Sequence, residues 1–376
     1  MMDWTDRHCR YFLRGFSPSV LLYTEMITSS AILRGDRDRL LAFDTEEHPV
    51  ALQLGGSEPA DLARAARAGE EAGYDEINLN CGCPSDRVAS GAFGACLMLE
   101  PQRVADSVAA MKAAVKLPIT VKMRIGVVEA KQRGVADNHR AAETSDTSGS
   151  HGTANQHSKP KSHNAAIAQV SEQDFAALHH FVTLIKDAGC EAAIVHARKA
   201  VLGGLSPKEN REIPPLRYDI VRNLKREFPG LPVIVNGGLR DVPTTLDALT
   251  WSDGVMLGRE AYHRPMLLAE LESALNPAAQ GGSLTAREST ASPGPATSSQ
   301  TPLTREQVLD RMSRYASREL ARGERLSSIT RHMLGLYAGQ PGARDYRRTL
   351  SEGARALGAG AELIRKSVPG RAGQSF

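Results

Sequence analysis

Short apolar segments recur along the chain, and amphipathic stretches lie between them. Eight apolar segments occupy residues 1–4, 21–26, 50–56, 76–82, 119–126, 192–199, 232–238 and 253–259. The stretches at 59–73 and 101–115 have helical periodicity and are bounded by Gly or Pro. Strands that alternate with helices predict a parallel sheet, and eight such units predict a closed (β/α)8 TIM barrel of the α/β class. The first segment is the weakest, so we expect the natural chain to begin upstream of Met1, with residues that complete this strand.

Two segments interrupt this pattern. Residues 131–171 lack periodic apolar positions, so we expect a disordered insertion there. Residues 276–303 are rich in Ser, Thr, Pro and Ala, which is typical of a flexible linker. The pattern therefore predicts a catalytic barrel at 1–275 that carries the insertion, then the linker, then a helical domain at 304–376.

The charge of the chain is unevenly distributed. The whole chain has a formal net charge of +3, but residues 302–376 contain thirteen Arg and one Lys against seven acidic residues, a balance of +7. The remainder therefore carries −4. A basic part joined to a slightly acidic body is typical of an appended module that binds a polyanion, although a solvated Arg-rich helical face would have the same composition.

Cysteine usage and hydropathy indicate the compartment. The five cysteines (Cys9, Cys81, Cys83, Cys96 and Cys190) are odd in number and lack C-x-x-C spacing, which favours a reducing cytosol over a disulfide framework or a structural metal site. The start of the chain does not resemble a signal peptide, and no apolar run approaches the ~18 residues of a membrane span. We expect a soluble, cytoplasmic monomer with no metal and no membrane partner.

Polar side chains collect at the carboxyl ends of the predicted strands. Side chains alternate between the faces of a strand, so Asn78 and Asn80 share one face while Ile77 and Leu79 share the other. The same alternation, or a place at a strand end, selects Glu25, Gln53, Lys122, Arg124, His196, Arg198 and Asn236. Because buried Lys and Arg are costly without partners, these residues predict a site lined by several strands at one end of the barrel.

Glycines at the last two predicted strands indicate a phosphate site. The seventh strand ends in Asn236, Gly237 and Gly238, and the eighth ends in Gly258 and Arg259. Phosphate sites in such barrels are commonly built after strands seven and eight, where glycines let backbone N–H groups approach an anion. The chain contains no G-x-G-x-x-G or Walker loop. The pattern therefore favours a phosphomonoester over a dinucleotide or ATP.

The motif FGACLM carries a cysteine just past the fourth predicted strand. A loop after a strand is where such enzymes keep their chemistry, so Cys96 is a candidate for catalysis, although free cysteines usually act as small packed hydrophobes. Cys81 and Cys83 are predicted to pack rather than to bind metal. Asn80 either reads the edge of a pyrimidine or caps the turn that follows it.

Ten motifs in order resemble the tRNA-dihydrouridine synthases, specifically their A subfamily. They are MMDWTDRHCRYFLR, LYTEM, EEHPVALQLGGSEP, GYDEINLNCGCPSDRV, FGACLM, VKMRIGV, VHARKA, LSPKENREIPPLRYD, VNGGL and DGVMLGR. The resemblance covers nearly the whole chain apart from the two low-complexity segments. It implies an FMN-binding barrel, a C-terminal helical domain that binds tRNA, and NADPH-dependent reduction of uridine to 5,6-dihydrouridine at positions 20 and 20a of the D-loop. It further implies that hydride goes from reduced FMN to C6 of the base and that a proton goes from Cys96 to C5.

The resemblance also implies roles for individual residues. Cys96 matches the catalytic cysteine. The FMN-binding positions correspond to Met1, Met2, Gln53, Lys122, His196, Asn236, Gly237, Gly238, Gly258 and Arg259. The tRNA-contacting positions correspond to Phe93, Lys208, Arg211 and Arg331.

Three other functions are compatible with parts of this sequence. Lys122 in a desolvated pocket would suit a Schiff-base aldolase on the same barrel. Another FMN barrel that acts on a free pyrimidine would not need the basic C-terminal part. An RNA chaperone with an inert barrel would not need polar strand ends or phosphate loops.

Overall fold

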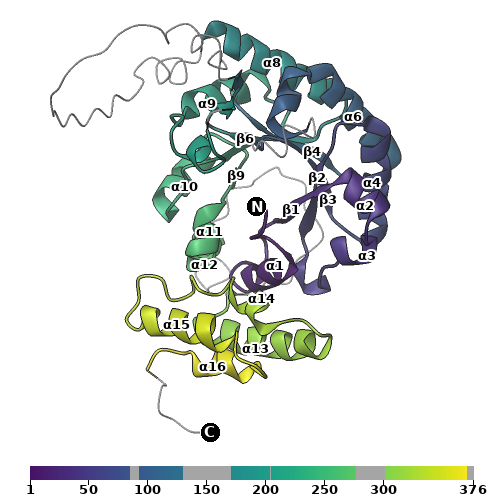
Figure 1. Cartoon of the computed structure of the whole chain (residues 1–376). Helices are drawn as coiled ribbons and strands as arrows, with labels where there is room; N and C mark the ends of the chain where they lie inside the picture. The colour runs from purple at the N-terminus through teal and green to yellow at the C-terminus, as the bar shows by residue number, and fades with distance from the viewer. Residues whose placement is uncertain (85–92, 130–170, 204, 277–300, 371–376) are drawn as a thin grey trace, which may run out of the picture.

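Seven parallel strands form one curled sheet, and helices surround its outer face (Figure 1). The computed structural model describes residues 1–84, 93–129, 171–203, 205–276 and 301–370. In chain order and in spatial order the strands are β1 (Leu22–Thr28), β2 (Val50–Gly55), β3 (Glu76–Cys81), β4 (Ile119–Arg124), β6 (Ala192–His196), β8 (Val233–Asn236) and β9 (Gly254–Met256). A separate parallel pair consists of β5 (Val127–Glu129) and β7 (Ala200–Leu202).

The outward side chains of the strands form the main core. Leu52, Ile77, Val121, Val195 and Val235 are fully buried. The helices around the sheet are α2 (Ser29–Arg34), α3 (Arg37–Leu40), α4 (Pro59–Ala72), α6 (Pro101–Ala114), α8 (Glu172–Asp187), α9 (Tyr218–Glu227), α10 (Val242–Leu249), α11 (Arg259–His263) and α12 (Met266–Leu275). Burial of the outward face leaves the inward face for polar residues.

Local sequence explains where the two predicted helices begin and end. Both α4 and α6 have Pro in the first turn, where its fixed φ suits a helix and its missing N–H costs nothing. α4 ends at Gly73, whose φ of 95° lies in the left-handed region that favours glycine. The predictions at 59–73 and 101–115 are thus confirmed.

The predicted first strand is wrong. Residues 1–5 form a turn in which the carbonyl of Met1 accepts from the backbone N–H groups of Trp4 and Thr5, at 3.0 Å each. These local hydrogen bonds occupy the groups that a strand would offer to neighbours. The main sheet therefore has seven strands within the described residues, rather than the predicted eight. Its first and last strands, β1 and β9, are not paired with each other there, so the ring of strands is not closed. The N-terminal turn lies inside the curl (Figure 1).

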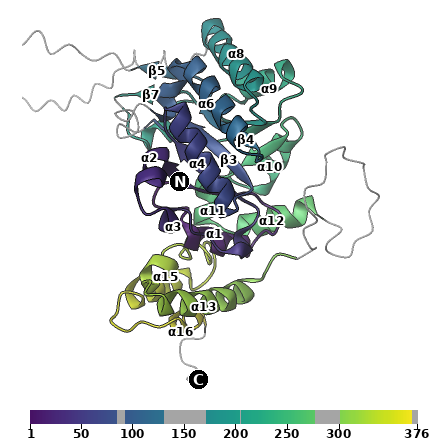
Figure 2. The same ribbon diagram turned by 90° about the vertical axis from the view of Figure 1, so that its right-hand side faces the viewer.

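The chain after the barrel region is helical where it is described. Helices α13 (Arg305–Ala321), α14 (Leu326–Thr330), α15 (Ala343–Gly353) and α16 (Glu362–Lys366) form a layer beside α1 (Arg7–Arg14) (Figure 2). Thr304 caps α13 in a reciprocal pair with Gln307. The predicted insertion, except for its last residue, and nearly all of the predicted linker lie outside the described residues.

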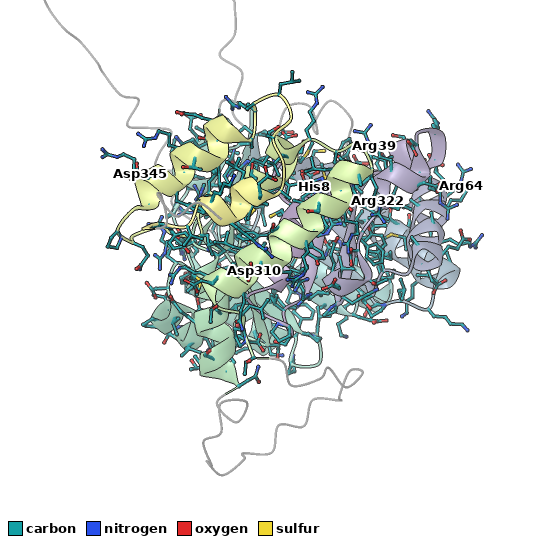
Figure 3. The ribbon with its side chains drawn as sticks, turned by 90° about the horizontal axis from the view of Figure 1, so that it is seen from below. His8, Arg39, Arg64, Asp310, Arg322 and Asp345 are labelled. Carbon is teal, nitrogen blue, oxygen red and sulfur yellow. The ribbon has the colours of Figure 1, made fainter. Side chains whose placement is uncertain are left out.

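Aromatic and ionic contacts join this helical layer to α1. The rings of Tyr11 and Tyr315 stack with centroids 4.0 Å apart. His8 Nδ1 lies 2.7 Å from the Tyr315 hydroxyl, and Arg7 pairs with the buried Glu319 at 2.8 Å. In Figure 3 His8 lies beside α13, which runs between the labelled Asp310 and Arg322. The contacts hold the helical layer against the N-terminal helix.

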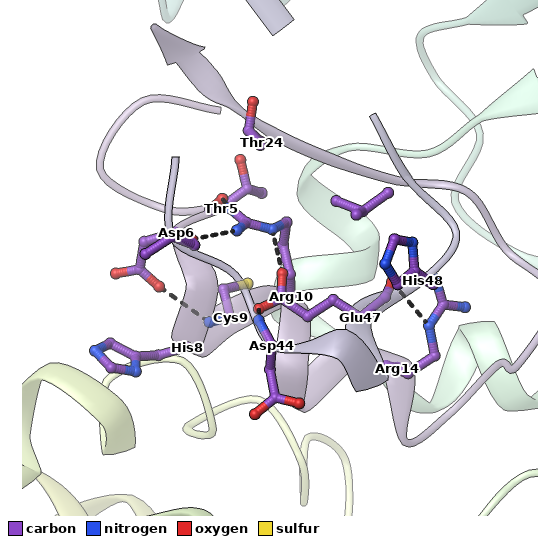
Figure 4. A network of polar contacts seen from close by, with 12 residues as sticks. Thr5, Asp6, His8, Cys9, Arg10, Arg14, Thr24, Asp44, Glu47 and His48 are labelled. Atoms are coloured by element: carbon purple, nitrogen blue, oxygen red, sulfur yellow. Dashed lines mark hydrogen bonds and ion pairs between the residues drawn. The ribbon is translucent and has the colours of Figure 1, made fainter. Parts of the chain in front are cut away.

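A buried polar network anchors α1 to the rest of the barrel region (Figure 4). Arg10 Nε donates to Glu47 Oε2 at 2.6 Å, and both side chains are buried. Arg14 donates to the carbonyls of Ser17, Glu47 and Pro49 at 2.7, 2.9 and 2.9 Å. Because each buried cation is paired or fully hydrogen-bonded, the cost of burying its charge is offset.

Candidate active site

The inward side chains of five strands meet at the carboxyl ends of the sheet. Gln53 on β2, Asn80 on β3, Lys122 on β4, His196 on β6 and Asn236 on β8 belong to this set. The parallel register places Asn80 beside Lys122 and His196 beside Asn236. The predicted grouping of polar residues at strand ends is confirmed, because alternation along each strand also sends the apolar neighbours outward.

Direct contacts link members of this set. Lys122 Nζ donates to Asn236 Oδ1 at 3.1 Å, and Asn236 Nδ2 donates to the carbonyl of Met256 at 2.7 Å. Asn80 Nδ2 donates to Gln53 Oε1 at 2.8 Å. The amide oxygen of Asn80 makes local hydrogen bonds instead. Its Oδ1 accepts from the N–H groups of Gly82 and Cys83 at 3.0 Å each. Asn80 therefore caps the turn after β3, as one of the two predictions for it had it.

The site is electropositive and poorly solvated. Burial, with the neighbouring Arg124 as a second cause, lowers the pKa of Lys122 to about 8. Burial also holds the pKa of His196 well below its usual value, and Arg124 and Lys122 act in the same direction. His196 is therefore neutral near pH 7. Its buried Nδ1 atom has no hydrogen-bond partner within the described part of the chain, so it is available to a ligand.

Two consecutive glycines follow β8 in a conformation that other residues rarely adopt. Gly237 and Gly238 have φ values of 107° and 76°. A Cβ on Gly237 would lie 2.8 Å from the ring of His196, and the Tyr218 hydroxyl donates to the Gly237 carbonyl at 2.5 Å. The loop therefore runs close to the site and leaves room for backbone to approach a ligand, as expected for an anion-binding turn.

Arginines surround the glycine loop. Burial lowers the pKa of Arg198, and the nearby Arg259 and Arg240 lower it as well. Partial burial of the Arg211 guanidinium lowers its pKa too, with Arg259 as the next cause that lowers it. Arg259 Nη1 pairs with Glu212 at 2.9 Å. Four guanidinium groups against one carboxylate make this edge suitable for a phosphate.

The two N-terminal methionines differ in position. A Cβ on Gly258 would lie 3.8 Å from the sulfur of Met1, so Met1 lies beside the end of β9. Met2 is 47% exposed. A flavin contact for Met1 or Met2 stays a prediction.

Cys96 lies in a 3-10 helix that packs against the loops above the sheet. This helix, η2 (Gly94–Leu99), starts at Gly94 with a φ of 77°, and Ala95 N donates to the carbonyl of Cys83 at 2.9 Å. The Cys96 thiol is half-buried and donates to the Phe93 carbonyl at 3.1 Å. Burial raises its pKa. The thiol is therefore protonated at neutral pH, which a proton donor requires.

The other two cysteines near β3 have different surroundings. Cys81 is fully buried in the core, as predicted. Cys83 is half-buried, and negative charge on its sulfur would raise the pKa of Lys122, Arg124 and Arg211, so it lies in the neighbourhood of the cations of the site. Cys83 is thus a second thiol near the site, where the sequence pattern predicted only packing.

The predicted tRNA-contacting residues fall in two places. Phe93 lies over the end of β2, since a Cβ on Gly55 would be 3.2 Å from its ring. Lys208 and Arg211 are exposed at η3 (Glu209–Arg211). Arg331 lies instead at the junction with α1, where its Nη2 pairs with Asp6 at 2.6 Å. Its predicted contact with RNA stays a prediction.

Arg124 organises the loops around the site, a role that strand alternation alone does not predict. Its guanidinium donates to the carbonyls of Gly82, Lys199 and Asn210 at 3.1, 3.2 and 3.1 Å. One buried cation thereby ties together the loops after β3 and β6 and the turn at η3. Its place two residues after Lys122, on the same face of β4, is the signal that points to it.

Comparisons with known proteins cover nearly the whole chain. The model of the dihydrouridine synthase (Dus) family matches residues 1–145 and 160–368. The chain belongs to the dihydrouridine synthase family. The tRNA-dihydrouridine(20/20a) synthase of Xanthomonas campestris pv. campestris is 46% identical over 367 residues, 98% of this chain and 90% of the relative. The proteins of the same name from Vibrio cholerae and Pseudomonas aeruginosa are each 46% identical, over 98% and 93% of this chain and 94% and 87% of their own lengths.

Membership of the dihydrouridine synthase family bears on the alternatives. A lysine whose pKa is lowered to about 8 would also suit a Schiff-base aldolase. The family assignment instead favours a flavin enzyme over an aldolase or an inert RNA chaperone. Within the described residues no cluster of side chains could hold a metal ion, and none of the helices there is long and apolar enough to cross a bilayer.

Proposed function

We propose that this chain reduces uridine to 5,6-dihydrouridine at positions 20 and 20a of tRNA, with bound FMN and with NADPH as the reductant, in the cytoplasm. The observation that carries the proposal is the similarity to tRNA-dihydrouridine(20/20a) synthases at 46% identity over 98% of the chain. The site geometry supports the cofactor and the chemistry, as set out below.

The residues at the carboxyl ends of the strands fit FMN. The glycine pair Gly237 and Gly238, with Gly258 and Arg259, would hold the phosphate, because flexible backbone lies there beside several guanidinium groups. Gln53, Lys122 and His196 would border the ring, where the unpartnered Nδ1 of His196 offers a hydrogen bond. When bound, FMN would supply the hydride for C6 of the base.

The protein would supply the proton and the charge stabilisation. The protonated thiol of Cys96 would deliver a proton to C5, as a general acid. Lys122 lies in a poorly solvated site, so its ammonium group would strongly stabilise negative charge on a uracil carbonyl oxygen. Burial disfavours the charged form of Lys122, and a bound anion would favour it again by raising the pKa of the amine.

The tRNA would reach the site with the target base turned out of its stack. A base in a folded loop must be extruded before it can reach a cofactor inside a sheet. Phe93, Lys208 and Arg211 border the entrance and would contact the RNA there. Arg331 and the arginine-rich residues 304–376, which we propose to form a separate RNA-binding domain, would add phosphate contacts that weaken with salt.

The test compares two single cysteine variants of the full-length protein. Cys96→Ala should keep FMN and tRNA binding but lose at least about 100-fold in turnover, because general acid catalysis contributes 10²–10⁴-fold. Cys83→Ala is the matched control, since it removes a second thiol on the loops after β3, the one coupled to Lys122. Turnover is measured as dihydrouridine formed in unmodified tRNA with NADPH.

Two results would contradict the proposal. An inactive Cys83→Ala variant beside an active Cys96→Ala variant would show that Cys83, and not Cys96, supplies the proton. A protein that binds no flavin after reconstitution would show that FMN is not its cofactor, and the proposed reaction depends on FMN.

A further inference from the structure

A continuous line of hydrogen bonds crosses the inner face of the sheet. It starts at the turn after β3, where Asn80 Oδ1 accepts from Gly82 N and Cys83 N. Asn80 Nδ2 donates to Gln53 Oε1, Gln53 Nε2 to Asn78 Oδ1, and Asn78 Nδ2 to Thr120 Oγ1, each at 2.8 Å. Thr120 Oγ1 then donates to Glu76 Oε1 at 2.6 Å. The line ends at the first residue of β3, the far end of the strand from the candidate site.

Both ends of this line dictate the same direction. A backbone N–H can only donate, and an ionised carboxylate can only accept. Between them, three amides and one hydroxyl could each point either way. With Glu76 accepting, the Thr120 hydroxyl must donate to it, and every amide before it must then donate toward Glu76. All five links have this one polarity.

The surroundings make a reversed amide expensive. Asn78 is fully buried, and the side chains of Thr120, Gln53 and Asn80 are at most 9% exposed. Water therefore cannot replace a lost partner, and a buried unsatisfied donor or acceptor is costly. Tyr23 also donates to Glu76 Oε1, at 2.8 Å, from outside the line. The pKa of Glu76 lies above its usual value, because burial raises it more than the hydrogen bonds from Thr120 and Tyr23 lower it.

We propose that Glu76 is a positioning residue: through Thr120 and Asn78 its carboxylate holds, together with the turn at Gly82 and Cys83, the edge of the Gln53 amide that faces the flavin. This inference rests on the proposed function, because Gln53 is the member of the line that would border the flavin ring. Glu76 itself touches no reacting atom. Its effect on the site is carried by the orientation of amides, and it also holds the turn at Gly82 and Cys83 through Asn80.

The matched pair Thr120→Val and Thr120→Ser tests the line at its narrowest link. Valine has nearly the shape of threonine but no hydroxyl, so it separates Asn78 from Glu76, whereas serine keeps the hydroxyl. Tyr23→Phe is the control, because it removes a hydrogen bond to the same carboxylate without cutting the line. Glu76→Gln is a second variant, in which the acceptor-only end is replaced by an amide.

Three readouts are taken on the full-length protein: FMN affinity, the absorbance spectrum of bound FMN, and hydrogen exchange of the backbone N–H groups of Gly82 and Cys83. Thr120→Val should weaken FMN binding about tenfold, shift the spectrum and speed the exchange about tenfold, since the buried Asn78 amide loses its acceptor and the amides before it lose their link to Glu76. Glu76→Gln should change the same readouts in the same direction. Thr120→Ser and Tyr23→Phe should stay within about twofold of wild type, with melting temperature as the check on folding.

Equal FMN affinity, spectrum and exchange in Thr120→Val and Thr120→Ser would overturn the proposal. So would changes in Tyr23→Phe as large as those in Thr120→Val, because they would show a general effect of Glu76 on stability. Failure of both Thr120→Val and Glu76→Gln to fold would also count against it, since the role would then be structural. Wild-type protein that binds no FMN would contradict the proposed function instead, and the exchange readout would still judge the hydrogen-bond line.

Discussion

At the scale of residues, Lys122 shows how the fold prepares a charged site without its ligand. Its ammonium group lies on the inner face of the sheet, hydrogen-bonded to Asn236 and close to a second cation, Arg124. Burial and Arg124 lower its pKa to about 8, so at neutral pH the folded protein bears the cost of a poorly solvated charge. A bound anion would offset that cost.

Removal of this charge should therefore stabilise the flavin-free protein. Lys122→Met should raise the free energy of unfolding at pH 7, by at most about 3 kcal/mol, since each pKa unit corresponds to about 1.4 kcal/mol. Between about pH 8 and pH 10.5 the unfolded wild-type chain binds a proton that the folded chain releases, so wild-type stability rises with pH and the advantage of Met shrinks. Urea unfolding of both proteins at pH 7 and pH 9.5 measures this. A Met variant less stable than wild type at pH 7 would show that Lys122 is well solvated.

Alternation along the strands could be read from the sequence, and it brought Gln53, Lys122, His196 and Asn236 to one end of the sheet. The glycine pair at 237–238 was found by its place after the seventh predicted strand. Alternation also selected Arg124, but contacts that depend on loops could not be read in this way. Arg124 acts through three backbone carbonyls, and Cys83 acts through its distance to cations. Neither relation has a sequence period.

At the scale of elements, α1 is the piece that joins the sheet to the C-terminal helices. Asp6 caps it by accepting from Cys9 N at 3.0 Å, and the same carboxylate pairs with Arg331 and His332. Burial alone would raise the pKa of Asp6, but hydrogen bonds from His332, Cys9 and Arg331 hold it well below its usual range. One carboxylate thus serves both a helix cap and a junction.

Two substitutions separate these roles. Asp6→Asn keeps a capping oxygen but loses the charge, whereas Asp6→Ala loses both and should cost about 1 kcal/mol more in the free energy of unfolding. Because the folded pKa of Asp6 is lowered, its contribution is present above the unfolded value of about 3.9 and is lost as the pH falls further. The gap between wild type and Asp6→Asn, measured by urea unfolding, should narrow from pH 7 to pH 3. A gap that widens over this range would mean that the charge of Asp6 does not stabilise the fold.

The order of strands and the two predicted helices followed from hydrophobic periodicity, which is why they were found without a structure. The predicted strand at 1–4 failed because an apolar segment does not by itself specify extended backbone. Met1 accepts two local hydrogen bonds, and Asp3 has a φ of 62°, which closes a turn. Residues 131–170 and 277–300 lie outside the described residues, so the predicted insertion and linker remain predictions.

At the scale of the whole molecule, charge and architecture both suit a large anionic substrate. The candidate site is bordered by arginines, and the C-terminal residues 302–376 carry a balance of +7. The helical layer is held beside α1 rather than tethered loosely, because stacked rings and ion pairs cross the junction. A folded RNA that offers a loop to the site could therefore meet a basic surface fixed at one distance from it.

The measurement that tests this account most directly is a map of dihydrouridine in a single tRNA. An unmodified transcript is incubated with the full-length protein, FMN and NADPH, and each uridine is then assayed for reduction. The account predicts dihydrouridine at positions 20 and 20a and unchanged uridine elsewhere in the D-loop. Unchanged uridine at both positions, with the flavin bound and reduced by NADPH, would contradict it.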